Sequence, residues 1–174
     1  MQLKNGKELT IRNARKEDAA ELITYINIVG GESDNLLFGA NEFNMTVEQE
    51  EKFIESLTQA QTSTLLVGEV DGRIICVGNI SARNRERVAH QCELALSVLK
   101  EFWGQGVGTA LMKALIDFAK STGKLEIIHL KVKADNVPAI ALYKKLGFQE
   151  IGRFPRDTKI DGVYYDAILM NLYL

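Results

Sequence analysis

The strongest constraint on this chain is a glycine-rich segment, Trp103–Thr109, with glycine at positions 104, 106 and 108. Before it, apolar residues alternate with other types over Cys92–Val98, which predicts a half-buried strand. After it, apolar residues recur at helical spacing from Val107 to Phe118. The chain is therefore expected to form a strand, a sharp turn and a helix, and glycine lets such a turn approach a ligand closely.

The predicted turn is suited to bind a phosphate, because the first N–H groups of a helix have no internal partners and that end is positive. Two common phosphate loops are excluded. The dinucleotide pattern G-x-G-x-x-G fails because Thr109 or Leu111 occupies its third glycine position, and no Gly-Lys-Ser/Thr occurs anywhere. The same turn would also serve a close helix–strand crossing that binds nothing.

A second marked segment lies further along, at Asp135–Phe148. Asn136 is suited to cap a helix, Pro138 to its first turn, and Gly147 to the left-handed residue that follows its end. A strand over residues 127–132 precedes it. Asn136 and Tyr143 are two helical turns apart and share nearly one face, separated by roughly 10 Å along the axis. A long, thin ligand beside that face could contact both.

Together the two segments resemble the GNAT superfamily of acetyl-coenzyme A-dependent N-acetyltransferases. The family pattern of glutamine or arginine followed by x-x-G-x-G/A matches Trp103–Gly108, except that Trp103 occupies the first position. The family pattern of asparagine followed by a helix ending in L-Y-x-K-x-G-F matches Asn136–Phe148. The resemblance covers residues 64–170 well and the N-terminal third in outline.

The resemblance and the order of elements predict a mixed α/β (α+β) fold in one domain over residues 1–174. We expect a central twisted, mixed, mostly antiparallel sheet with helices on both faces. In the N-terminal third, a strand near residues 9–11 precedes a helix over about 17–28, which Gly30–Asn35 is expected to end. A capping box, Thr46 with Gln49, predicts the start of a second helix.

Asp71-Gly72 predicts a tight hairpin between strands 64–70 and 73–81. At the end of the chain, strands 149–154 and 163–172 are expected to flank a loop over 155–162.

The resemblance implies acetyl-coenzyme A as co-substrate and no metal. The glycine turn would hold its pyrophosphate, strand 92–98 would pair with its pantetheine arm, and the Asn136 side chain would bind that arm. The N–H of Val98 would stabilise an oxyanion. The residues assigned to the cofactor are Leu96, Ser97, Val98, Gly104, Gln105, Gly106, Val107, Gly108, Thr109, Asn136 and Tyr143.

Tyr143 is the expected general acid for the leaving thiolate. A phenol with a pKa of about 10 stays protonated at neutral pH, and a thiol has a pKa of about 8.5. The alternative is that Tyr143 is only an aromatic residue of the core.

Glu93 is the expected base, because related enzymes often place a glutamate on this strand. Simple alternation turns its side chain to the face opposite Leu94, unless a bulge redirects it. His90 and His129 are alternatives by residue type. Lys131 occupies another position that some relatives use, and it is unsuited to the role.

The expected acceptor is a primary amine of a small molecule or of a peptide or protein N-terminus. Its pocket is expected to be formed by the segments between the first two helices and by the closing loop. Acidic residues there could attract a cationic amine, and aromatic residues could form an apolar surface. The acidic residues are Glu32, Asp34, Glu42 and Asp161, and the aromatic ones are Phe38, Phe43, Phe154, Tyr164 and Tyr165. The alternatives are solvated acids and core aromatics.

Composition limits the remaining function classes. The net charge of −2 gives no basic field for nucleic acid, and no apolar run is long enough for a membrane span. The N-terminus lacks the apolar stretch of a signal peptide, so a cytoplasmic protein is expected, with Cys76 and Cys92 reduced and buried. The sequence leaves open whether the protein forms a homodimer. The alternative function is a non-catalytic coenzyme A-binding sensor or interaction module.

Overall fold

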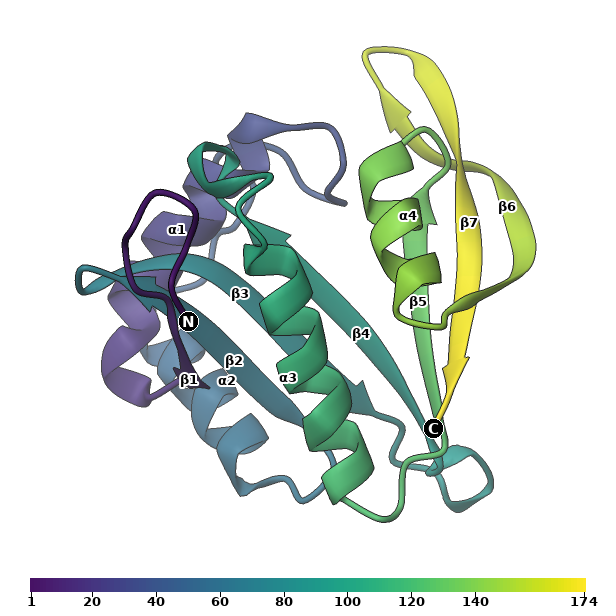
Figure 1. Cartoon of the computed structure of the whole chain (residues 1–174), viewed down its shortest axis with the longest axis horizontal. Helices are drawn as coiled ribbons and strands as arrows, with labels where there is room; N and C mark the ends of the chain where they lie inside the picture. Colours follow the sequence, from purple (N-terminus) through teal and green to yellow (C-terminus); the bar gives the residue numbers. More distant parts are fainter.

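The computed structural model describes all 174 residues, and its strands form one seven-stranded sheet (Figure 1). The strand order is β1-β2-β3-β4-β5-β7-β6. The strands are β1 (Thr10–Asn13), β2 (Thr64–Val70), β3 (Arg73–Ala82), β4 (Gln91–Val98), β5 (Ile127–Lys133), β6 (Gln149–Ile160) and β7 (Val163–Tyr173). Only β4 and β5 pair in parallel. The expected mixed, mostly antiparallel sheet is confirmed.

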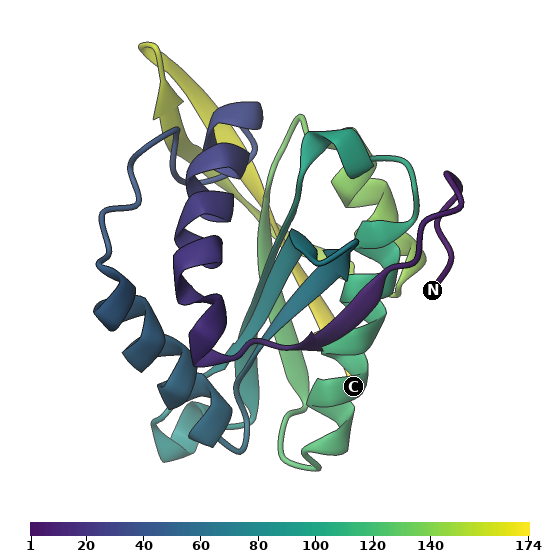
Figure 2. The same cartoon turned by 90° about the vertical axis from the view of Figure 1, so that its left-hand side faces the viewer.

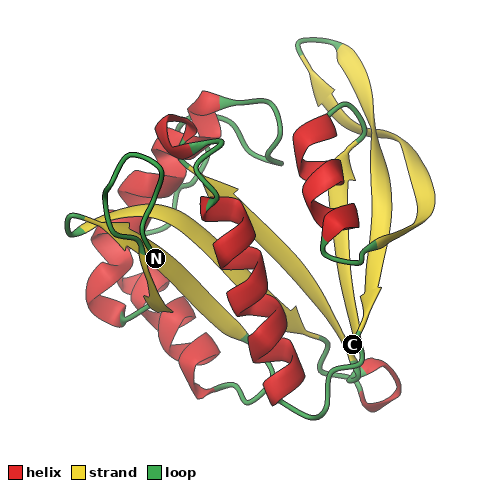
Figure 3. Cartoon of the chain, in the orientation of Figure 1, coloured by secondary structure: helices red, strands yellow, loops and turns green.

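Two pairs of helices cover the two faces of the sheet (Figure 2). The helices are α1 (Ala19–Glu32), α2 (Val47–Gln59), α3 (Val107–Ser121) and α4 (Val137–Lys145). The first two lie on one face, and α3 and α4 lie on the other, as Figure 3 also shows. None of these helices combines the length and the apolar character needed to cross a membrane.

Helix α3 lies unusually close to the sheet because β3 carries a glycine beneath it. A Cβ added to Gly78 would lie 2.8 Å from Cδ1 of Leu115 and 3.1 Å from Cδ2 of Leu111. Both leucines are fully buried. This close packing fixes the N-terminus of α3, and with it the glycine turn, at the end of β4.

Several local structures that were predicted from short sequence patterns are confirmed. Thr46 and Gln49 form the reciprocal capping box at the start of α2, with hydrogen bonds of 3.2 and 2.9 Å. Asp71 and Gly72 both have positive φ between β2 and β3, as a two-residue hairpin requires. Gly147 has a φ of 95° and follows Leu146, the C-cap residue of α4.

The first helix ends within Gly30–Asn35 as expected, but its expected last residue near position 28 is wrong, because α1 continues through both glycines to Glu32. The two glycines serve close packing inside the helix. A Cβ on Gly30 would lie 2.6 Å from the carbonyl oxygen of Gly39, and one on Gly31 would lie 3.1 Å from Cβ of Ala40. The α1–α2 connection therefore packs against α1 at a distance that leaves no room for a Cβ at these two positions.

The expected loop over residues 155–162 is also wrong, because β6 continues through most of it. A bulge between Phe154 and Thr158 absorbs the additional residues. The carboxylate of Asp166 on β7 accepts a hydrogen bond of 2.9 Å from the backbone N–H of Arg156 inside this bulge. The bulge keeps β6 and β7 paired past the proline, so the hairpin is longer than expected.

Replacing Gly30 by alanine tests the packing of the α1–α2 connection. The Cβ would collide with backbone of that connection, so we expect the free energy of unfolding to fall by at least about 1 kcal/mol, despite the higher helix propensity of alanine. Urea unfolding measures the change. Thr24→Ala, at an exposed site of the same helix, is the control, and equal stability of the two variants would contradict the packing role.

Candidate functional site

The glycine turn presents a run of free backbone donors. Gly104 and Gly106 have φ values of 71° and 89°, a left-handed conformation that favours glycine. The first bond of the following helix runs from Ala110 N to Gly106 O. The backbone N–H groups from Gly104 to Thr109 donate to no acceptor in the chain. Such a run at a helix N-terminus is an anion-binding arrangement.

Three side chains, one from the N-terminus and two from the turn itself, hold this turn. Lys4 Nζ donates to the carbonyl oxygen of Gly104 at 2.9 Å, and Gln105 Nε2 donates to that of Glu101 at 3.1 Å. Trp103 Nε1 donates to the carbonyl oxygen of Val98 at 2.7 Å. The turn is therefore fixed to the end of β4 as well as to α3. No sequence pattern predicts the contacts of Lys4 and Trp103, because they depend on the fold.

Strands β4 and β5 pair only at their first residues. Gln91, Cys92 and Glu93 have partners on β5, and the two strands then diverge (Figure 1). On the other edge of β4, Arg83 N donates to Gln91 O and Leu99 N donates to Ile75 O. Antiparallel pairing uses alternate residues, so the odd-numbered residues of β4 bond to β3.

The even-numbered residues of β4 therefore direct their backbone groups into the gap. Past the paired stretch these are Leu94, Leu96 and Val98. Two of the three strand residues assigned to the cofactor, Leu96 and Val98, thus present backbone to the gap. Ser97, the third, directs its backbone to β3.

The side chains of β4 divide between the two faces of the sheet. Leu96 pairs with Gly78, which lies against α3. Ser97 lies on the opposite face, where its Oγ is 2.9 Å from the hydroxyl of Tyr25 on α1. Tyr25 is buried, and this burial raises the pKa of its phenol. The residue was missing from the predicted site, because no local pattern marks a contact between α1 and β4.

Glu93 shares the face of Ser97 and is exposed. The β3–β4 register is regular from Cys92 to Val98, so no bulge redirects its side chain. Glu93 therefore lies on the α1–α2 side of the sheet, opposite α3 and α4. This is the side of the segments expected to bind the acceptor.

The two marked sequence segments meet in space. A Cβ on Gly108 would lie 3.6 Å from Cδ2 of Leu142 in α4, the residue before Tyr143. Asn136 caps α4, and its Oδ1 accepts a hydrogen bond of 3.3 Å from Ala139 N. Its Nδ2 donates to no acceptor in the chain and stays available. The glycine turn and α4 thus border the gap between β4 and β5 from the same face of the sheet (Figure 1).

Tyr143 packs against the core and also keeps a free hydroxyl group. Its ring packs against the core and lies 5.9 Å from the Phe148 ring, centroid to centroid. Burial raises the pKa of the Tyr143 phenol to about 12. Its hydroxyl makes no hydrogen bond within the chain. Tyr143 is therefore a half-buried phenol that keeps its proton and has a free donor.

The alternative bases have other partners. The two ring nitrogens of His129 lie 2.7 Å from Asn171 Oδ1 and 3.1 Å from Gln91 Oε1. Lys131, which was expected to be unsuited as a base, forms an ion pair of 2.7 Å with Asp157. Of the predicted candidates, Glu93 has the only carboxylate, and no hydrogen bond or ion pair engages it.

The comparisons with known proteins decide the family. Residues 35–148 match the family model described as Acetyltransferase (GNAT) family. The chain belongs to the GNAT family. It is an acetyl-coenzyme A-dependent N-acetyltransferase.

Similar proteins and solved structures agree with this assignment, two of them over nearly the whole chain. An N-alpha-acetyltransferase of Sulfurisphaera tokodaii is 32% identical over 96% of this chain and 94% of its own length. The crystal structure of a GNAT-family acetyltransferase from Streptococcus pneumoniae has a TM-score of 0.94 at 32% identity, covering 96% of this chain and 100% of that one. The L-amino acid N-acetyltransferase AaaT of Escherichia coli is 32% identical over 60% of this chain and 65% of its own length.

The acidic residues expected to bind the acceptor have different surroundings in this N-acetyltransferase. Glu32 is engaged, because its Oε2 accepts a hydrogen bond of 2.7 Å from Lys100 N, next to the glycine turn. Asp34 and Glu42 are exposed on the α1–α2 connection, which begins beside the β6–β7 tip (Figure 1, Figure 2). Asp161 lies in the tight turn at that tip, with a φ of 48°.

The aromatic residues expected at the acceptor site are not all core residues. Phe154 and Tyr164 are 52% and 51% exposed, so a core role is wrong for both. The Lys133 ammonium lies 3.8 Å from the centroid of the Tyr165 ring. Phe38 and Phe43 are half-buried. Exposed rings and cations therefore line the β6–β7 hairpin.

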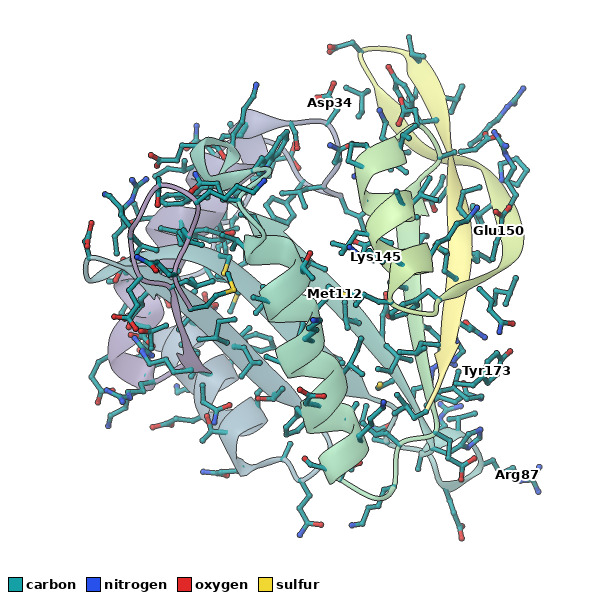
Figure 4. The ribbon with its side chains drawn as sticks, viewed as in Figure 1. Asp34, Arg87, Met112, Lys145, Glu150 and Tyr173 are labelled. Carbon is teal, nitrogen blue, oxygen red and sulfur yellow. The ribbon has the colours of Figure 1, made fainter.

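A hollow formed by residues 82–88 lies away from this site. Figure 4 shows Arg87 of that loop at the end of the molecule opposite Asp34. The hollow contains no residue of the glycine turn or of α4.

Both cysteines are free and buried, as expected. Burial raises the pKa of the Cys76 and Cys92 thiols to about 12. Burial thus favours the neutral thiol at both positions, which argues against a thiolate nucleophile there.

The thiols of the folded enzyme are therefore expected to resist alkylation. Iodoacetamide at pH 8 should leave both cysteines unmodified by mass spectrometry, and both should react once urea unfolds the chain, because their pKa then returns to about 8.5. Rapid modification of either thiol in the folded enzyme would contradict the burial.

Proposed function

We propose that this N-acetyltransferase moves the acetyl group of acetyl-coenzyme A directly to a primary amine, within a complex that holds both substrates. One observation carries the proposal. The free N–H groups of Gly104–Thr109 and the helix of Tyr143 border the same gap in the sheet, and a Cβ added to Gly108 would lie 3.6 Å from Leu142 Cδ2.

The residues present fit acetyl-coenzyme A. The free N–H groups of the glycine turn would hold the pyrophosphate. The gap-facing backbone of Leu96 and Val98 would pair with the pantetheine arm, and Asn136 Nδ2 would donate to it. When bound there, the cofactor supplies a thioester whose acetyl group can pass to an amine.

Ser97 has a different part in this proposal. Its hydroxyl is engaged with Tyr25, and its backbone groups are directed to β3. We therefore assign Ser97 to fixing β4 rather than to touching the cofactor.

Acid and base lie on opposite faces of the sheet in this proposal. Glu93, on the α1–α2 side, takes a proton from the incoming amine through bridging waters, because it lies five residues, about 16 Å, along β4 from Val98. The amine nitrogen bonds to the acetyl carbon, the Val98 N–H stabilises the oxyanion, and the carbon–sulfur bond breaks. Tyr143, on the α4 side, gives its proton to the sulfur. The raised pKa of Tyr143 supports this role, because the phenol stays protonated throughout the neutral range.

Relatives suggest which amines to test. Their names include N-alpha-acetyltransferase, L-amino acid N-acetyltransferase and spermidine N(1)-acetyltransferase. A panel of short peptides, amino acids and polyamines, scored by release of coenzyme A thiol, tests the proposal. Turnover with a primary amine supports it. Tight binding of coenzyme A without turnover on any amine would instead favour a sensor or interaction module.

Removing the Tyr143 hydroxyl separates its catalytic role from its packing. Tyr143→Phe keeps the ring beside Phe148, so stability and acetyl-coenzyme A affinity should change little. Loss of a general acid should lower kcat about 100-fold. Steady-state kinetics and calorimetry measure both quantities, and an unchanged kcat would refute the acid role.

Asn136 offers a matched pair of substitutions. Asn136→Asp keeps the oxygen that caps α4 but loses the Nδ2 donor, so we expect weaker acetyl-coenzyme A binding with unchanged stability. Asn136→Ala loses both, and its free energy of unfolding should also fall by about 1 kcal/mol. Wild-type affinity in Asn136→Asp would show that Asn136 acts only as a cap.

A further inference from the structure

The one tryptophan of the chain, Trp103, begins the glycine turn. Its indole is partly exposed, yet Nε1 donates a 2.7 Å hydrogen bond to the carbonyl oxygen of Val98. We infer that Trp103 is a positioning residue that fixes the end of β4 relative to the glycine turn. The inference rests on the proposed function, because it assigns the acetyl end of the cofactor to Val98 and the pyrophosphate to the turn.

The peptide group that Trp103 contacts is held at both ends. It joins Val98 to Leu99, and the N–H of Leu99 donates to Ile75 O on β3 at 3.0 Å. Its carbonyl oxygen is on the gap side, where β5 has already diverged and supplies no donor. An unpaired carbonyl there would leave the strand end free to rotate. The indole N–H of Trp103 donates to this carbonyl oxygen in place of a backbone N–H from β5.

The same side chain fixes the start of the turn. The backbone N–H of Trp103 bonds to Lys100 O at 3.1 Å, and Gly104 follows in the left-handed conformation. One residue thus joins the free donors of the turn to the gap-facing backbone of Val98. Their separation is set by a hydrogen bond rather than by a flexible connection.

This contact also explains why tryptophan can stand where the family pattern has glutamine or arginine. All three side chains carry an N–H donor. Phenylalanine has a similar flat ring without one. In this chain the indole N–H supplies such a donor to Val98.

Substitutions that separate the donor from the ring test the inference. Trp103→Phe should lower kcat about tenfold, because the strand end loses a hydrogen bond that matters in the transition state. Affinity for coenzyme A in calorimetry should change much less, since the N–H groups of the turn remain. Trp103→Gln, which restores a donor, should recover most of kcat. Phe53→Leu, at a partly exposed aromatic site on α2, is the control and should act like wild type.

A wild-type kcat in Trp103→Phe would overturn the inference, and so would equal losses in the Phe and Gln variants. In either case the wild-type enzyme still turns over, so the proposed function survives. A wild-type chain without turnover on any amine would overturn both.

The emission of Trp103 supplies a readout independent of turnover, because no other tryptophan contributes. Titrating coenzyme A into the wild-type enzyme should change this emission with the same dissociation constant as calorimetry. Gly108→Glu, which adds a negative charge among the free N–H groups, should abolish the change. Unchanged emission at calorimetric saturation would contradict the position of the indole beside the cofactor.

Discussion

The divergence of β4 and β5 is the constraint on which the rest of the site depends. Each strand is stabilised on its outer edge, β4 by β3 and β5 by β7, so neither needs the other beyond Glu93. A parallel pair requires a long crossover, and α3 supplies it. The result is a strand edge with unpaired backbone groups inside the molecule. Such groups require partners, and an extended ligand can supply them.

The chemistry follows from the alternation of β4 across this edge. Successive side chains face α3 or α1, while the backbone of Leu96 and Val98 faces the gap. A thioester in the gap would have Glu93 on one side and Tyr143 on the other. The amine can then arrive from the α1–α2 side while the thiol leaves on the α4 side, and neither has to pass the other.

The elements of both motif segments were predictable because their signals are local. A glycine turn, a capping asparagine and a left-handed glycine act within a few residues, and the alternation around Glu93 gave its face correctly. The misassigned segments had local signals that tertiary contacts override. Gly30 looks like a helix end, but it serves the packing of Gly39, and the bulge held by Asp166 carries β6 past a proline.

The same limit applies to the site. Tyr25 and Lys4 contact the β4 end and the glycine turn through the fold alone, across long separations in sequence. Neither residue has a pattern of its own that could have indicated these contacts. Trp103 was visible in the sequence, but only as a departure from the family pattern. Its role depends on the indole reaching Val98, which requires the turn to fold back over the strand end.

The central claim is that the free amides of the turn and the gap-facing backbone of β4 bind one ligand together. Backbone amide NMR shifts of the isotope-labelled enzyme, followed during titration with coenzyme A, test it most directly. We expect the largest shifts at Gly106, Gly108, Leu96 and Val98, all saturating together. Unmoved amides at these positions, with the main shifts around Arg87 or elsewhere, would contradict it.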